Sequence, residues 1–292
     1  MTKSLALPPA PPTQALPVEQ ERSAELLRNL QSQARYLFRE DEFARHTGRE
    51  PGSPASQLAL QRLSKAGRIV LAQKNAARWL IVPPEQAHYG APPVDWWLDD
   101  LMRDQEPAYY LALLSAARFW GSSHYAYQAT QVMVSRPRRP LAVGKLRVEF
   151  IVKKTLGDTP VVHERTRTAR MRISTREATV LDLIRHQNTV GGLEAVARIA
   201  HDLLPKMTSA GVLDAVRALN QVPAVQRFGF VLDHLGGARL AGTVAKWLQQ
   251  QRRSVQPLAT PKDDQATMHM VDGKWAIEYT LNQHELLKEM RG

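Results

Sequence analysis

Apolar residues recur every three or four positions in several segments of the chain, a pattern that predicts helices with one buried face. This spacing predicts one helix over residues 18–38 and a short one over residues 41–46. Ser53 as the N-cap and Pro54 at the first helical position predict a third helix, which Gly67 ends.

Two short runs of β-forming residues follow the third helix. They cover residues 68–73 and 78–82, and the small and polar residues 74–77 between them are typical of a hairpin turn. Three helices and a hairpin in this order predict a winged helix-turn-helix over residues 18–83. Four prolines and a glycine near residues 84–94 predict a linker after this module.

The pattern predicts a larger domain that mixes helices and strands over residues 95–292. Its expected elements are a mostly helical segment over 95–118, strands near 130–134, 145–153 and 170–173, helices near 192–204, 207–219, 223–235 and 238–251, and a last β region over 275–280. In the strand over 145–153, apolar and charged residues alternate, so we expect one face on the core and one exposed. Ser174 and Glu177 form a capping box that opens a helix to about His186.

The predicted fold class is therefore α+β, with an N-terminal winged helix-turn-helix and a larger mixed α/β C-terminal domain. Residues 1–17 contain five prolines and predict a disordered, extended tail. Trp96 and Trp97 lie beside an apolar helical segment, so we expect them in a core between the two domains.

The third helix is the expected DNA-reading helix of a winged helix. If Leu60, Leu63 and Ala66 face the core, the opposite face presents polar side chains to DNA. These are Ser56, Gln57, Gln61, Arg62 and Lys65. Glutamine pairs with adenine and arginine with guanine, and Lys74 and Arg78 of the hairpin are expected to contact phosphates. Leu58 shares the polar face, where it would either contact thymine methyl groups or pack on the second helix.

The net charge of +11 and the isoelectric point near 10.1 favour a nucleic-acid partner. The charge is concentrated in residues 136–176, which hold 12 basic and 3 acidic residues. The predicted basic surface of the larger domain consists of Arg136, Arg138, Arg139, Lys145, Arg147, Lys153, Arg170 and Arg172. Such a surface either extends a DNA contact or simply keeps the protein soluble.

Candidate catalytic groups are incomplete. A metal-dependent nuclease of the restriction-enzyme type needs a lysine two residues after a strand glutamate, but Ile151 follows Glu149 at that spacing. The pairs Asp182–His186 and His201–Asp202 offer only two donors each, and the run Ser122–His124 lacks the glycines of a nucleophile elbow. We therefore expect no enzyme, no metal and no cofactor. A DNA-targeted nuclease and a winged helix that docks proteins remain the alternatives.

The absence of cysteine excludes a disulfide framework and cysteine-ligated metal. No apolar run approaches the length of a membrane span, and residues 1–17 lack the pattern of a secretory signal. These features predict a cytoplasmic protein without a membrane partner.

Several segments resemble the AbiEi-type antitoxins of bacterial abortive-infection systems. They are Tyr109–Ala117, which is similar to the opening helix of that domain, Ile173–Leu183 followed by Gly191–Leu193, and the closing segments Arg227–Leu232 and Trp275–Ile277. Together with the N-terminal module, the resemblance covers most of residues 20–285.

The resemblance implies the antitoxin of a type IV toxin–antitoxin system, which is not an enzyme. Such antitoxins neutralise a co-encoded nucleotidyltransferase toxin, without necessarily holding it in a stable complex. They also repress their own operon, with the winged helix bound to inverted repeats in double-stranded promoter DNA. The larger domain carries the antitoxicity and often assists DNA binding.

Overall fold

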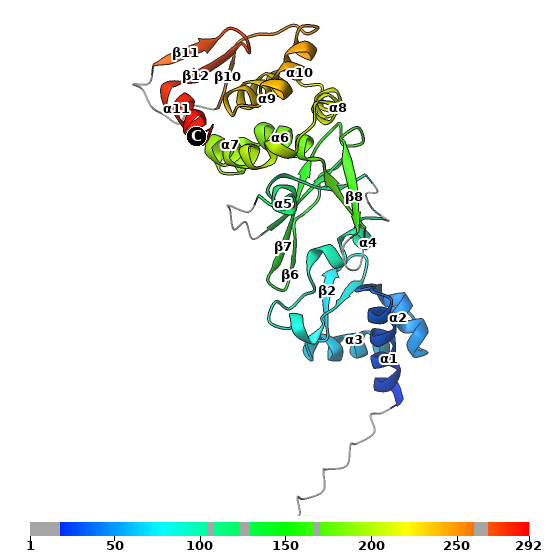
Figure 1. Cartoon of the computed structure of the whole chain (residues 1–292). Coiled ribbons are helices and arrows are strands. Elements are labelled where there is room, and N and C mark those ends of the chain that lie inside the picture. Colours follow the sequence, from blue (N-terminus) through cyan, green and yellow to red (C-terminus); the bar gives the residue numbers. More distant parts are fainter. Residues whose placement is uncertain are drawn as a thin grey trace, which may run out of the picture.

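The computed structural model describes residues 18–103, 105, 108–122, 129–165, 170–259 and 268–291. The predicted tail, residues 1–17, lies outside the described residues. Figure 1 shows an elongated molecule with an N-terminal module at one end, a large sheet in the middle and a helical bundle at the other end. The mixed α+β class predicted from the sequence is confirmed.

The N-terminal module contains the three predicted helices and the predicted hairpin. Its elements are α1 (Val18–Ser32), β1 (Leu37–Arg39), α2 (Glu40–Thr47), α3 (Pro54–Lys65), β2 (Ile69–Gln73) and β3 (Arg78–Ile81). The strands form an antiparallel sheet in the order β1-β3-β2. The first helix is shorter than predicted because Ala34 adopts a left-handed φ of 57°, and Leu37 and Phe38 therefore belong to β1.

The segment after the module has less helix than predicted. It contains the short helices η1 (Pro84–Gln86) and η2 (Val94–Trp96), then α4 (Leu98–Arg103), strand β4 (Tyr110–Leu111) and α5 (Leu113–Phe119). The prediction of a mostly helical segment over 95–118 is wrong at β4, where Tyr110 and Leu111 join the large sheet. The pairing of β4 with two distant strands overrides its local helical pattern.

The large sheet has six strands. Besides β4 they are β5 (Ala129–Val134), β6 (Leu141–Val143), β7 (Leu146–Val152), β8 (Val161–Arg165) and β9 (Arg170–Ser174), in the order β6-β7-β5-β4-β9-β8. The pairs β5–β7 and β4–β9 are parallel and the other three pairs are antiparallel. Strand β7 is the predicted strand over 145–153, and its Val148 aligns with Thr130 of β5.

One face of this sheet packs on the segment before it and on the N-terminal module. Val132 and Val148 share a buried cluster with Trp97 of the connecting segment and with Leu80 of the module. The ring of Trp96 lies 4.7 Å, centroid to centroid, from the ring of Tyr36 in the module. The expected tryptophan core between the two parts of the chain is therefore confirmed.

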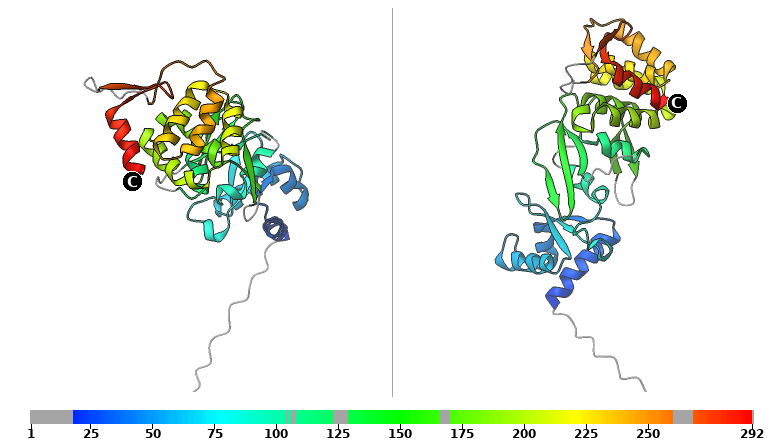
Figure 2. Two further views of the ribbon diagram at one scale, coloured as in Figure 1. Left: turned by 45° about the horizontal axis from the view of Figure 1, so that its top comes forward. Right: turned by 90° about the vertical axis from the view of Figure 1, so that its left-hand side faces the viewer.

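The other face of the sheet meets the helical bundle (Figure 2). The bundle contains α6 (Arg176–Arg185), η3 (Gln187–Thr189), α7 (Gly192–Leu203), η4 (Leu204–Lys206), α8 (Ser209–Leu219), α9 (Val222–His234), α10 (Ala238–Leu248) and α11 (Leu281–Arg291). A small sheet in the order β10-β12-β11 lies beside it and consists of β10 (Gln256–Pro257), β11 (His269–Asp272) and β12 (Ile277–Thr280). None of the helices that the structure describes has the length and apolar content needed to span a bilayer.

The predicted capping box at the start of α6 is wrong, although the helix itself is present. Thr175, not Ser174, is the N-cap, and its Oγ1 accepts a hydrogen bond from the Ala178 amide at 3.3 Å. The Glu177 carboxylate instead accepts a hydrogen bond from the amide of Thr208, the N-cap residue of α8, at 2.8 Å. Glu177 therefore connects α6 to α8 rather than capping the N-terminus of its own helix.

Candidate nucleic-acid interface

Helix α3 starts at the predicted N-cap. The Ser53 hydroxyl accepts a hydrogen bond from the Ser56 amide at 3.2 Å, and Pro54 follows at the first helical position. Helix α3 packs against strand β2, so the hairpin lies alongside the helix (Figure 1). The exposed side of α3 and the turn between β2 and β3 lie close together, because residues of both line one groove.

A groove of about 300 Å³ runs between α3 and the hairpin. Its lining includes four of the residues predicted to contact DNA, namely Gln57, Gln61, Lys65 and Lys74. All four side chains are exposed. The Gln57 side-chain amide donates to the Gly52 carbonyl at 3.0 Å, which holds that end of the groove to the turn before α3.

Arg62 lies on the opposite flank of α3 from this groove. It lines a separate cavity of about 260 Å³ together with Arg49 and Arg68. The Leu58 side chain is 46% exposed and does not belong to the buried cluster of the module. Helix α3 therefore presents polar side chains on both flanks of an exposed leucine.

Two of the predicted contacts are wrong. Ser56 is fully buried, because it precedes the buried Leu60 by four residues and so shares its face of the helix. Arg78 is 6% exposed, and its Nη1 donates to the carbonyl of Leu101 at 3.0 Å. Since Leu101 belongs to α4, Arg78 anchors the module to the larger domain and is not available to phosphates.

Residues 135–140, which contain three arginines of the predicted basic surface, lie against the hairpin turn. Arg138 and Arg139 line a cavity of about 370 Å³ together with Lys74 of that turn. Arg136 and Arg139 are exposed. Arg138 is half-buried, with its guanidinium 5.2 Å from the centre of the Phe150 ring and hydrogen-bonded to the Gln105 side chain. The hairpin and this loop therefore form one continuous basic edge.

The remaining residues of the predicted basic surface do not form a single patch. Lys145 and Arg147 are exposed near the start of β7, whereas the exposed Arg170 and the half-buried Arg172 belong to β9. Strands β5 and β4 separate β7 from β9 in the sheet. The structure thus divides the predicted surface between two parts of the sheet.

The assignment of Lys153 to the exposed surface is wrong. Its side chain is 3% exposed and forms an ion pair with Asp182 of α6, with Nζ 2.8 Å from Oδ1. The hydroxyl of the buried Tyr110 donates to the other Asp182 oxygen at 2.8 Å and accepts from Lys153 at 3.0 Å. Burial, together with the Asp182 carboxylate, raises the pKa of Tyr110 well above its ordinary value. This buried triad links β4, the residue directly after β7, and α6.

The groups considered for catalysis occupy other roles. Ile151, which stands where a nuclease lysine would be, packs against the core shared with the bundle. The Ser122 hydroxyl donates to Asp202 at 2.6 Å, while Ser123 and His124 lie outside the described residues. In the part of the chain that the structure describes, no three histidine, aspartate or glutamate side chains gather as a metal site.

Comparison with protein families adds the decisive observation. Residues 110–234, from β4 to the end of α9, match the model of the AbiEi antitoxin C-terminal domain. The chain contains an AbiEi antitoxin domain. The resemblance found in the sequence is confirmed for this segment, and the AbiEi domain supports a role as the antitoxin of a toxin–antitoxin system.

The fold around the AbiEi domain also occurs in a solved structure. The RV2827C protein from Mycobacterium tuberculosis superposes with a TM-score of 0.62 at 15% sequence identity. The similarity covers 94% of this chain and 95% of that chain, so it includes the N-terminal module. Comparison with curated proteins gives no match.

Proposed function

We propose that this protein is the antitoxin of a type IV toxin–antitoxin system. It counteracts a nucleotidyltransferase toxin and represses its own operon by binding promoter DNA through the N-terminal module. One observation carries the proposal: a chain with an AbiEi antitoxin domain also has a groove beside α3 that collects Gln57, Gln61, Lys65 and Lys74. Amide and ammonium groups along an exposed helix are suited to base edges and phosphates.

The basic edge formed by the hairpin turn and residues 135–140 indicates the path that the bound DNA would follow. With α3 in the major groove, Lys74 of the hairpin turn meets the adjacent backbone. Arg139 and Lys74 line the same cavity, so the DNA backbone that meets Lys74 would continue onto the larger domain. The buried contacts of Arg78 and Trp97 fix the module against that domain. The hairpin turn and residues 135–140 are therefore held in a fixed arrangement and would bind DNA as one surface.

Replacing Gln61 by alanine should relax DNA specificity. A bidentate amide contact to adenine contributes about 1–3 kcal/mol of discrimination, which corresponds to a loss of roughly tenfold or more in preference for the operator. Fluorescence anisotropy with the DNA upstream of the gene and with scrambled duplex measures this ratio. Gln249→Ala, at the exposed end of α10, is the matched control. An unchanged ratio in the Gln61 variant would remove Gln61 from the set of base-reading residues.

Lys74→Gln and Arg139→Gln should weaken binding to every sequence alike. Removing one phosphate contact lowers the slope of log affinity against log salt by about 0.9. Titrations at several salt concentrations give the slope for each variant. Lys246→Gln and Arg217→Gln, which remove exposed charges from α10 and α8, should leave the slope unchanged. If Arg139→Gln behaves like its control, the DNA does not reach the larger domain.

Co-expression tests the antitoxin part of the proposal. A nucleotidyltransferase encoded beside this gene should arrest growth when expressed alone, and this protein should restore it. Continued arrest in the presence of the folded protein would reject antitoxin action against that toxin. The outcome is independent of DNA binding, because it needs no operator.

Docking of a protein by the N-terminal module is the second candidate. Leu58 and Leu71 are 46% and 37% exposed on α3 and β2, and Leu71 lines the groove beside the helix. Exposed apolar residues near a groove also suit a protein partner. Partner binding that does not change with salt, and no preference for promoter DNA, would favour this function over DNA binding.

A further inference from the structure

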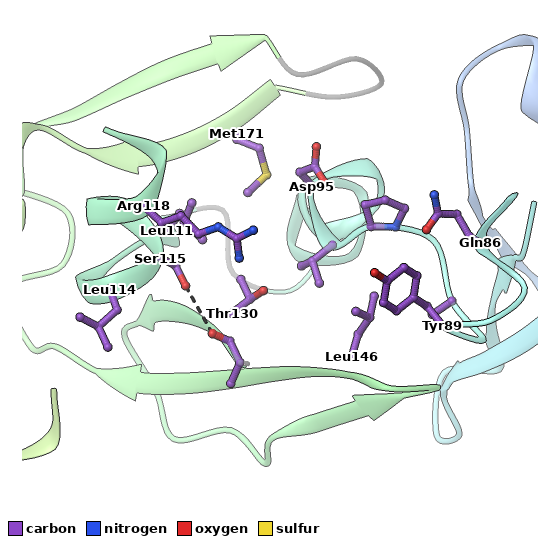
Figure 3. Close-up of a pocket in the computed structure, with 14 residues that line it drawn as sticks. Gln86, Tyr89, Asp95, Leu111, Leu114, Ser115, Arg118, Thr130, Leu146 and Met171 are labelled. Carbon is purple, nitrogen blue, oxygen red and sulfur yellow. Dashed lines mark hydrogen bonds between the residues drawn. The ribbon is translucent and has the colours of Figure 1, made fainter. Parts of the chain in front are cut away.

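A cavity of about 440 Å³ lies between residues 86–95, which follow the N-terminal module, and the large sheet. Figure 3 shows its lining. Leu111, Leu146 and Met171 contribute apolar surface, and Ser115, Thr130 and Arg118 contribute polar groups. Both the volume and this mixture are typical of small-molecule sites.

The wall formed by residues 86–95 is held in place by backbone contacts. The Lys145 amide donates to the Tyr89 carbonyl at 2.8 Å, and Gly144, with a φ of +57°, makes this approach possible. A Cβ atom on Gly144 would overlap the Tyr89 carbonyl oxygen and the Gly90 backbone. Farther along, the Trp97 indole donates to the Pro92 carbonyl at 3.0 Å. The cavity is therefore preformed on this side.

The wall formed by α5 is fixed by the buried Gln131. Its side-chain oxygen accepts a hydrogen bond from the Leu114 amide at 3.0 Å, and its backbone amide donates to the Ser115 hydroxyl at 2.9 Å. Leu113 has a φ of 50°, in the left-handed region that residues other than glycine rarely adopt. Strain of this kind persists only where the surroundings hold it, and it is often found beside ligand sites.

Arg118 supplies a positive charge in the cavity. Its guanidinium points toward the centre of the cavity in Figure 3. Among the described residues, no acidic side chain forms an ion pair with Arg118. Asp95 lies at another part of the wall, and burial raises the pKa of its carboxyl above the usual value. A guanidinium that faces an apolar cavity is suited to an anionic group on an apolar ligand.

We propose that this cavity binds a small amphipathic carboxylate, with the carboxylate on Arg118 and an aromatic or branched apolar body against Leu111, Leu146 and Met171. A single carboxylate matches the single arginine, whereas a phosphate dianion would need further positive groups. The hydroxyls of Ser115 and Thr130 lie within the same lining and can contact a polar substituent. The proposal does not depend on DNA binding or antitoxicity.

The test compares two probes of nearly the same shape on the full-length protein. Isothermal titration with 2-naphthoate and with its neutral analogue 2-naphthamide should show that the carboxylate binds at least about tenfold more tightly. Arg118→Gln should abolish this preference while leaving weak binding of the amide. Arg217→Gln, which removes an exposed charge from α8, should retain the preference.

A second variant tests the position of the apolar body. Thr130→Phe, on β5, should fill the cavity and reduce binding of both probes. The proposal is overturned if Arg118→Gln keeps the preference for the carboxylate, or if Thr130→Phe binds both probes like the unmodified protein. It is also overturned if neither probe binds the unmodified protein at about millimolar concentration.

Discussion

Lys153→Met is expected to lower the free energy of unfolding by about 3–5 kcal/mol. The variant keeps the length of the side chain but removes its charge, so Asp182 remains buried, 1% exposed, without its cation. The Tyr110 hydroxyl can still donate to Asp182, but it cannot neutralise the carboxylate. The cost is therefore that of an uncompensated buried charge, in addition to the loss of the hydrogen bonds from Lys153 to Asp182 and Tyr110. Urea unfolding followed by circular dichroism measures the change.

Three further variants separate charge from packing. Lys154→Met, at the exposed neighbouring position, should change stability by no more than about 0.5 kcal/mol. Tyr110→Phe should cost about 1.5–3 kcal/mol, because it removes a hydroxyl that is hydrogen-bonded to the charged groups of Asp182 and Lys153. The double variant Lys153→Met/Asp182→Leu should recover much of the loss, because no buried charge remains. Equal losses from Lys153→Met and Lys154→Met would show that the ion pair does not hold β7 to α6.

The different outcomes for Lys153 and for the tryptophans show what the sequence can predict. Alternation in β7 correctly predicted a strand, and the pair Trp96–Trp97 correctly predicted a core between the domains. Lys153 was predicted on an exposed face because period two distinguishes the two faces of a strand but does not show what covers each one. Here α6 covers the end of one face, and Asp182 comes from a distant part of the chain.

In the candidate interface, the errors have two different causes. The burial of Ser56 was available from the sequence, since it precedes Leu60 by four residues on the same helix. The burial of Arg78 was not, because it depends on the position of the Leu101 carbonyl in the next part of the chain. Helix faces follow from local spacing, whereas contacts between domains do not.

The Arg118 cavity could not be predicted from any motif. Its walls depend on the contact of Gly144, in the turn between β6 and β7, with Tyr89, and on the hydrogen bond of Gln131 to α5. Arg118 itself follows an apolar helical run and is exposed, as an arginine at such a position usually is. Only the fold shows that this arginine faces a cavity with apolar walls.

Two glycine-to-alanine substitutions in helices are expected to have opposite effects on stability. Gly229 of α9 faces Trp275, and a Cβ atom there would overlap the six-membered ring of the indole. A Cβ atom on Gly242 of α10 would have no atom within 4 Å other than those of its chain neighbours and its own helix backbone. Alanine at Gly242 should therefore stabilise the protein by about 0.4–1 kcal/mol, because it restricts the unfolded chain and favours the helix.

At Gly229 the same helical preference is outweighed by overlap with a ring that cannot move aside. Trp275 is fully buried, and its indole N–H donates to Asp233 at 3.0 Å while its carbonyl accepts from Gln226 at 2.9 Å. Gly229→Ala should cost about 3 kcal/mol, the upper end of the usual range for overpacking. Thermal unfolding should show a lower Tm for Gly229→Ala and a higher Tm for Gly242→Ala. A raised Tm in both variants would mean that Trp275 can leave α9, and that the segment after the AbiEi domain is not fixed to it.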